Sequence, residues 1–178
     1  MLAATWLGHL RVVGYLVSTM AWLAPAFAEP AEEYVAKAAF IYNVAQFSTF
    51  PDKNLGTMEM CVLGRDPFGP VLNSFVGKSV GASKLTVRYP KNSTDAIKQC
   101  RILFISSSEE DNLGAITESA REAGILTVAD MRGAARKGVM VELAIEDRRI
   151  AFEINNEAAR AANIAVSSKV LRLAKAVY

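Results

Sequence analysis

The sequence predicts an α/β fold in which a mostly parallel central sheet is followed by a C-terminal antiparallel hairpin. Strand-like apolar runs alternate with helical stretches from Met58 to Val128, which favours parallel strands joined by right-handed crossovers. Two alternating runs, Val139–Ile145 and Arg149–Asn155, are separated only by Glu146–Arg148, which indicates a hairpin and a mixed sheet. The uninterrupted apolar run Ile102–Ile105 suits a central strand, so helices are expected on both faces of the sheet.

Local signals place the elements that precede the hairpin. Tyr34–Phe50 carries apolar residues at helical spacing, and Pro51 is expected to end that helix. Ser107 and Glu110 have the spacing of a capping box, which predicts a helix that runs to Ala123. The remaining expected elements are strands at Met58–Leu63, Leu85–Tyr89 and Ile125–Val128, and short helices at Pro70–Phe75 and Ser93–Gln99.

Two further helices are expected after the hairpin. Asn155 or Asn156 is a candidate cap for a helix over Glu157–Ala162. Ser167 is a candidate cap for a last helix over Lys169–Val177, whose apolar residues recur at i, i+3, i+4 and i+7.

The first 28 residues have the layout of a secretory signal peptide. Arg11 precedes an apolar run, Pro25 breaks that run, and Ala26–Ala28 fits a small-x-small cleavage site. The apolar core is about a dozen residues, shorter than the roughly 20 that span a bilayer, which argues against an uncleaved anchor. We therefore expect cleavage after Ala28 and an exported single α/β domain over residues 29–178.

Composition excludes several classes of function. The formal net charge is +2 and the basic residues are dispersed, so no nucleic-acid partner is expected. The only histidine is His9, in the signal segment, so a cleaved protein has no histidine for acid–base catalysis or metal binding. Gly77–Ser79 resembles the end of a phosphate-binding loop, but Leu72 stands where that motif needs glycine. We therefore expect no catalytic residue, metal or cofactor, and no enzyme.

Glu153 is a charged residue within the otherwise apolar strand Ile150–Ile154. Because glutamate is rarely buried without a partner, it is either solvated at a sheet edge or held for a purpose. Glu142, on the other strand of the hairpin, could face it and form a carboxylate pair for acid–base chemistry. Solvation or pairing with nearby arginines is the simpler interpretation. The serines Ser106–Ser108 are interpreted as a helix cap, because a serine nucleophile would lack a histidine base.

Cys61 and Cys100 are the two cysteines of the chain. An even pair in an exported protein favours one disulfide, and the alternative is two buried free thiols. A regulatory or binding module is the first hypothesis for function. A periplasmic small-ligand binding protein is the second, with its crevice at the carboxyl ends of the parallel strands, near Gly64–Phe68 and Ser106–Ser108.

Five stretches, in order along the chain, resemble the YfiR family of periplasmic regulatory proteins. They are KAAFIYNVAQF, MCVLGRDPFG, CRILFISSSEE, GILTVAD, and RIAFEIN with AVSSKVLRLA. The resemblance runs from Tyr34 to Val177, and it implies a three-layer α/β sandwich and a non-enzymatic role.

The resemblance also implies partners and residue roles. Characterised members bind the periplasmic sensing domain of an inner-membrane diguanylate cyclase and repress it, which lowers cyclic-di-GMP and biofilm formation. An outer-membrane lipoprotein sequesters the repressor, dimers are common, and some relatives serve membrane histidine kinases. For this chain the implied disulfide is Cys61–Cys100, and the implied partner-binding residues are Phe152, Glu153 and Asn155.

Overall fold

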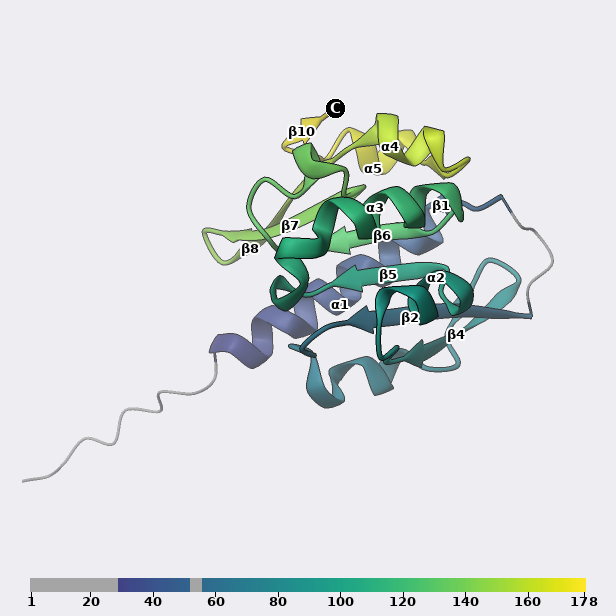
Figure 1. The fold of residues 1–178 in the computed structure, drawn as a ribbon. Coiled ribbons are helices and arrows are strands. Elements are labelled where there is room, and N and C mark those ends of the chain that lie inside the picture. Colours follow the sequence, from purple (N-terminus) through teal and green to yellow (C-terminus); the bar gives the residue numbers. More distant parts are fainter. Residues whose placement is uncertain (1–28, 52–55) are drawn as a thin grey trace, which may run out of the picture.

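The structure is a computed structural model that describes residues 29–51 and 56–178 (Figure 1). The expected signal peptide, with His9 and the cleavage site after Ala28, lies outside the described residues. Within the described part of the chain, no helix has both the length and the apolar character needed to cross a membrane.

Eight strands of the described residues form one sheet, in the order β10-β8-β7-β6-β5-β2-β4-β3. Its strands are β2 (Thr57–Leu63), β3 (Ser79–Val80), β4 (Ser83–Arg88), β5 (Ile102–Ile105), β6 (Leu126–Ala129), β7 (Val141–Glu146), β8 (Arg149–Ile154) and β10 (Ala176–Val177). Neighbours pair in parallel except at β7–β8 and β3–β4. The predicted mostly parallel sheet with a C-terminal antiparallel hairpin is confirmed.

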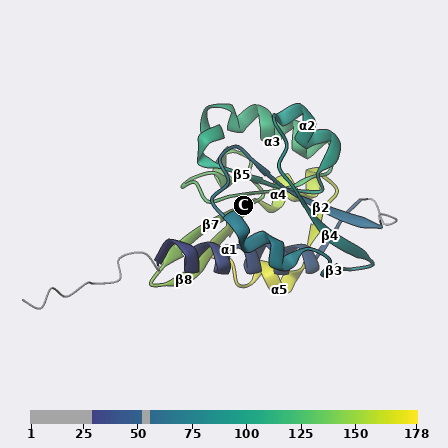
Figure 2. The same ribbon diagram turned by 90° about the horizontal axis from the view of Figure 1, so that it is seen from below.

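Helices cover both faces of this sheet, which gives three layers (Figure 2). The helices are α1 (Glu29–Gln46), α2 (Ser93–Gln99), α3 (Leu113–Glu122), α4 (Asn156–Ala161) and α5 (Ser168–Leu171), with short 3-10 turns η1 (Gly69–Phe75), η2 (Ser107–Asn112) and η3 (Ala135–Lys137). Successive strand side chains point to opposite faces. Ile102 and Phe104 therefore join the core beneath α1, whereas Leu103 and Ile105 join a second core beneath α2 and α3.

The first helix ends earlier than predicted. α1 stops at Gln46, and Ser48–Thr49 forms strand β1, which pairs antiparallel with β9 (Ala165–Val166) in a small second sheet. The carbonyl oxygen of Phe47 accepts a hydrogen bond of 2.9 Å from the Ser167 amide. Long-range pairing thus replaces the last helical turn that the sequence pattern predicted.

The predicted last helix over Lys169–Val177 is wrong beyond its first turn. α5 ends at Leu171, although Ser167 caps it as expected by accepting a bond from the Lys169 amide. The chain then runs along β8, where the Lys175 amide donates to the Phe152 carbonyl oxygen at 2.8 Å and continues into β10. The helical spacing of the apolar residues predicted a buried helix face, but Leu173, one of those residues, is 76% exposed.

The predicted helix from Ser107 to Ala123 is split into η2 and α3, and the capping box does not form. The Ser108 hydroxyl instead accepts a bond of 2.9 Å from the Arg65 amide, across two βα loops. The cap of α4 matches the expectation, since the Asn155 side chain accepts from the Ala158 amide at 2.8 Å.

Candidate functional site: a charged pocket on the β7–β8 hairpin

The geometry of the hairpin brings two acids face to face. A two-residue turn at Asp147 and Arg148, both with positive φ, joins β7 to β8 and fixes their register. In that register Glu142 lies directly opposite Glu153. Directly opposed residues project from the same face of the sheet, so the predicted juxtaposition of the two acids is confirmed.

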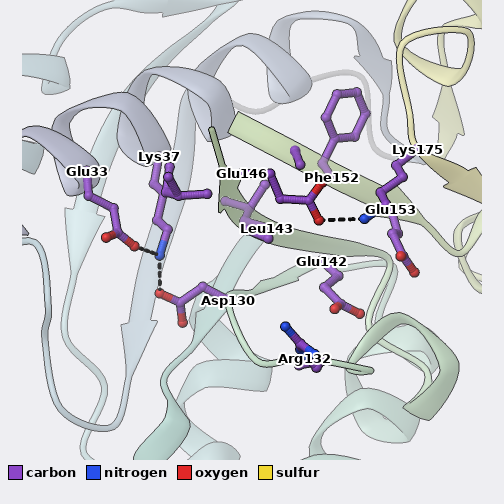
Figure 3. A pocket seen from close by; sticks show the side chains of 13 residues that line it. Glu33, Lys37, Asp130, Arg132, Glu142, Leu143, Glu146, Phe152, Glu153 and Lys175 are labelled. Atoms are coloured by element: carbon purple, nitrogen blue, oxygen red, sulfur yellow. Dashed lines mark hydrogen bonds and ion pairs between the residues drawn. The ribbon is translucent and has the colours of Figure 1, made fainter. Parts of the chain in front are cut away.

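The two acids line a pocket of about 550 Å³ beside the hairpin (Figure 3). The N-terminal half of α1, the loop that follows β6 and Lys175 form the rest of its wall. Its charged residues are Glu33, Lys37, Asp130, Arg132, Glu142, Glu146, Glu153 and Lys175, and its apolar residues are Leu143, Ala144, Ile145, Ala151 and Phe152. A mixed wall of this size is typical of a site that binds a ligand or a side chain.

Lys37 anchors α1 to the floor of this pocket. Its side chain is almost fully buried and its ammonium lies 2.7 Å from Asp130 Oδ2, while Glu33 forms a second ion pair one helical turn earlier. Tyr34 donates a hydrogen bond of 2.9 Å to the same Asp130 oxygen. Burial, reinforced by that hydrogen bond, raises the pKa of the Tyr34 hydroxyl above its usual range. A buried lysine needs such partners, so this cluster fixes α1 against the end of β6.

Glu142 is a structural acid. Only 7% of its surface is exposed, and its two oxygens accept bonds from the backbone amides of Gly133 (2.8 Å) and Ala135 (2.9 Å). Both bonds hold the loop between β6 and β7, which also carries Arg132 into the pocket. A carboxylate with both oxygens engaged by the backbone is positioned to stabilise that loop.

Glu153 is only half-buried and lies at the side of the pocket nearest Lys175 (Figure 3). Its Oε2 accepts a bond of 2.8 Å from the Tyr178 hydroxyl, which in turn accepts one of 3.1 Å from Arg136 Nε. Lys175 pairs with Glu146 at the rim, and that hydrogen bond raises the pKa of the Lys175 ammonium. The C-terminal segment therefore reaches the hairpin acids through two side chains.

Phe152 and Asn155, expected to bind a partner with Glu153, have different surroundings. Phe152 is 8% exposed, and its ring lies 4.5 Å from that of Phe40 on α1. Asn155 caps α4 and donates from Nδ2 to the Ala135 carbonyl oxygen at 2.8 Å. Both side chains hold neighbouring elements around Glu153, which is half-buried and makes neither a core contact nor a helix cap.

The crevice expected near Gly64–Phe68 and Ser106–Ser108 is closely packed at its centre. Gly64 has a φ of 87°, and a Cβ there would collide with the Ser108 hydroxyl and lie 2.9 Å from Glu109 Cγ. The pocket lies instead where β6 ends, at Asp130. This pocket lies at the carboxyl end of a strand, as expected, but of another strand than the two that were predicted; ligand binding near Gly64–Phe68 and Ser106–Ser108 stays a prediction.

The predicted disulfide is present. Cys61 on β2 and Cys100 at the end of α2 are bonded with a Cα–Cα distance of 5.8 Å, and both are buried. Disulfides persist in oxidising compartments, which fits an exported protein. The described residues contain no group of three or more His, Cys, Asp or Glu side chains arranged to hold a metal ion.

Comparison with known proteins assigns this chain to a protein family. The sequence profile of the YfiR/HmsC-like family matches residues 34–175. The chain belongs to the YfiR/HmsC-like family. Membership indicates a periplasmic regulator and favours a regulatory, non-catalytic role.

Solved structures share the fold of this YfiR/HmsC-like chain at low sequence identity. A conserved domain protein from Vibrio cholerae has a TM-score of 0.59 at 11% identity, over 82% of this chain and 60% of that one. An ABC domain from Streptococcus pneumoniae, in complex with L-Trp, has a TM-score of 0.57 at 8% identity, over 79% of this chain and 60% of that one. The chain thus spans about 60% of the length of both. A search of curated proteins found no match.

Sequence analysis of this YfiR/HmsC-like chain missed Lys37, Asp130, Lys175 and Tyr178. The pair that Lys37 forms with Asp130 spans 93 residues of sequence, so no local pattern indicates it. The available signal was the position of Asp130, directly after a strand of the parallel sheet.

Proposed function

We propose that this protein is a periplasmic regulator that binds and represses the periplasmic sensing domain of an inner-membrane signalling protein. A diguanylate cyclase is the proposed partner, so that repression lowers cyclic-di-GMP and biofilm formation. The observation that supports this proposal is the family match over residues 34–175, and the buried disulfide is consistent with a periplasmic location.

The proposed contact surface centres on Glu153 and the pocket beside it. Phe152 and Asn155 contribute by positioning, because one packs against α1 and the other joins α4 to the β6–β7 loop. An exposed or half-buried acid on a rigid hairpin suits a protein contact, since its geometry is fixed before the partner arrives. An outer-membrane lipoprotein that sequesters the regulator, and a homodimer, complete the proposal.

Deletion and capture test this function together. Deletion of the gene is expected to raise cyclic-di-GMP and biofilm, and the tagged protein is expected to capture an inner-membrane protein with a periplasmic sensing domain from crosslinked membranes. A captured histidine kinase in place of a cyclase would make the protein an adaptor for that kinase. Unchanged cyclic-di-GMP together with no captured membrane protein would refute the proposal.

Small-ligand binding is the second candidate function, and the pocket favours it. Its volume of about 550 Å³ lies within the range of ligand sites, and its wall combines apolar and charged side chains. A thermal-shift screen of small periplasmic metabolites tests it. A stabilising compound whose effect is lost in Arg132→Gln would support it, and a screen without any such compound would count against it.

A further inference from the structure

The pocket on the hairpin carries more negative than positive charge. Five carboxylates line it, from Glu33, Asp130, Glu142, Glu146 and Glu153, against three cations, from Lys37, Arg132 and Lys175. Lys37 is already shared between two of these acids. The excess of acids gives the wall a net negative charge, which favours a positively charged occupant.

Glu153 retains capacity for such an occupant. Both oxygens of Glu142 accept backbone amides, and Glu146 pairs with Lys175. In the part of the chain that the structure describes, Glu153 accepts one hydrogen bond, at Oε2 from Tyr178. An ionised carboxylate offers about four acceptor sites, so Glu153 retains the capacity for a charged donor.

The apolar part of the wall suits the aliphatic stem of a basic side chain. Ala144 and Ala151, which project from the same face of the hairpin as Glu142 and Glu153, line the pocket beside the acids. Arginine and lysine bury their methylene stems along apolar surface while their charged ends stay among polar groups. The wall and the acids together therefore match an amino-acid side chain better than a small inorganic cation.

The chain's own C-terminal segment already makes contacts of this kind. Lys175 presents an ammonium to Glu146, and Tyr178 presents a hydroxyl to Glu153. Backbone hydrogen bonds to β8 and α4 hold the segment itself, but its side-chain contacts are exposed: the side chains of Lys175 and Glu146 are 56% and 50% exposed. Exposed ion pairs contribute little to stability, so an incoming side chain has weak competitors here.

We propose that the pocket receives an arginine or lysine side chain of a protein partner, which pairs with Glu153 in place of the Tyr178 hydroxyl. The identity of that partner rests on the proposed regulatory function, whereas the chemistry of the pocket stands on the charges and contacts above. The Tyr178 hydroxyl and the Lys175 ammonium act as competitors for the acids, and the partner's basic side chain displaces the hydroxyl while the backbone of β10 stays paired with β8.

Titration of the isolated protein with short peptides tests this proposal without the partner. The probes are acetyl-Gly-Arg-Gly-amide, the matched Gln and Glu peptides, and amide chemical shifts as the readout. The Arg peptide is expected to shift the amides of β7, β8 and Arg132 saturably. Glu153→Gln is expected to weaken this binding about tenfold, because a charge-assisted hydrogen bond is lost.

Two variants separate competition from a merely structural role. Tyr178→Phe keeps the ring, frees Glu153 Oε2, and is expected to tighten binding of the Arg peptide roughly threefold or more. Lys175→Gln leaves Tyr178 in place and removes the competing ammonium, so it is also expected to tighten binding of the Arg peptide. Glu122→Gln, an exposed acid at the end of α3 that is not among the residues lining the pocket, is the matched control and is expected to change nothing. Helix α3 is seen in Figure 2.

Each outcome bears on the proposal. It is overturned if the Arg peptide does not bind saturably, if the Gln peptide binds equally well, or if Glu153→Gln or Tyr178→Phe leaves the affinity unchanged. If the pocket fails this test while membrane capture succeeds, the regulatory function stands and the contact lies elsewhere. If the Arg peptide binds as expected, but no membrane protein is captured and deletion leaves cyclic-di-GMP unchanged, the pocket stands and the proposed function falls.

Discussion

Glu142 and Glu153 lie opposite each other, yet substitution should affect them very differently. In wild type, the two oxygens of Glu142 accept from two backbone amides. Glu142→Gln keeps one acceptor oxygen, but its NH₂ group then faces the second backbone N–H, and two donors cannot form a hydrogen bond. The loss of one buried charge-assisted bond and the donor left unpaired are expected to cost about 2–3 kcal/mol of unfolding free energy. Glu153→Gln retains an acceptor for the Tyr178 hydroxyl at a half-buried site and should stay within about 0.5 kcal/mol of wild type.

Urea unfolding followed by circular dichroism measures this difference. With an m-value of about 2 kcal/mol per molar urea, the Glu142→Gln midpoint should fall by roughly 1 M or more, while the Glu153→Gln midpoint should hardly move. The amides of Gly133 and Ala135 should also lose protection from hydrogen exchange in Glu142→Gln alone. Equal midpoints for the two variants would refute the assignment of Glu142 as the structural acid.

Three further predictions concern stability. Reduction of the Cys61–Cys100 disulfide, which spans 39 residues, should lower the unfolding free energy by about 4 kcal/mol in matched urea titrations with and without reductant. Because folding raises the pKa of Tyr34, its contribution to stability is complete below about pH 10 and is lost as the pH rises above that value. Tyr34→Phe should therefore reduce the loss of stability at alkaline pH. It should also remove the tyrosinate absorbance step that occurs at the highest pH. Gly64→Ala should cost more than about 2 kcal/mol, whereas Gly77→Ala, also at positive φ but facing open space, should cost about 1 kcal/mol; equal costs would contradict the packing described at Gly64.

The interior of the sheet could be predicted because its signals are local. Ile102–Ile105 is fully buried on both faces, as an unbroken apolar run indicates, and the short turn after β7 fixed the opposition of Glu142 and Glu153. The last helix could not be predicted. Its periodicity is compatible with a helix, but the open edge of β8 offers hydrogen bonds to Lys175 and Tyr178, and that edge is visible only in the folded chain.

The pocket was predictable in part. Glu153 was identified because a charged residue in an apolar strand needs a partner or solvent. The partner, Tyr178, was assigned to no site, because it lies just beyond a segment expected to be helical. Lys37 and Asp130 meet only through the packing of α1 on the sheet, a contact that neither local sequence nor spacing encodes.

The decisive measurement is whether the Glu153→Lys variant still captures the membrane partner. This variant reverses the charge proposed to receive a basic side chain, and Glu122→Lys, at the end of α3 and outside the pocket wall, is its matched control. With fold and disulfide verified for both, the account predicts that Glu122→Lys captures the inner-membrane sensor and lowers cyclic-di-GMP like wild type, whereas Glu153→Lys does neither. Equal capture by the two variants would contradict it.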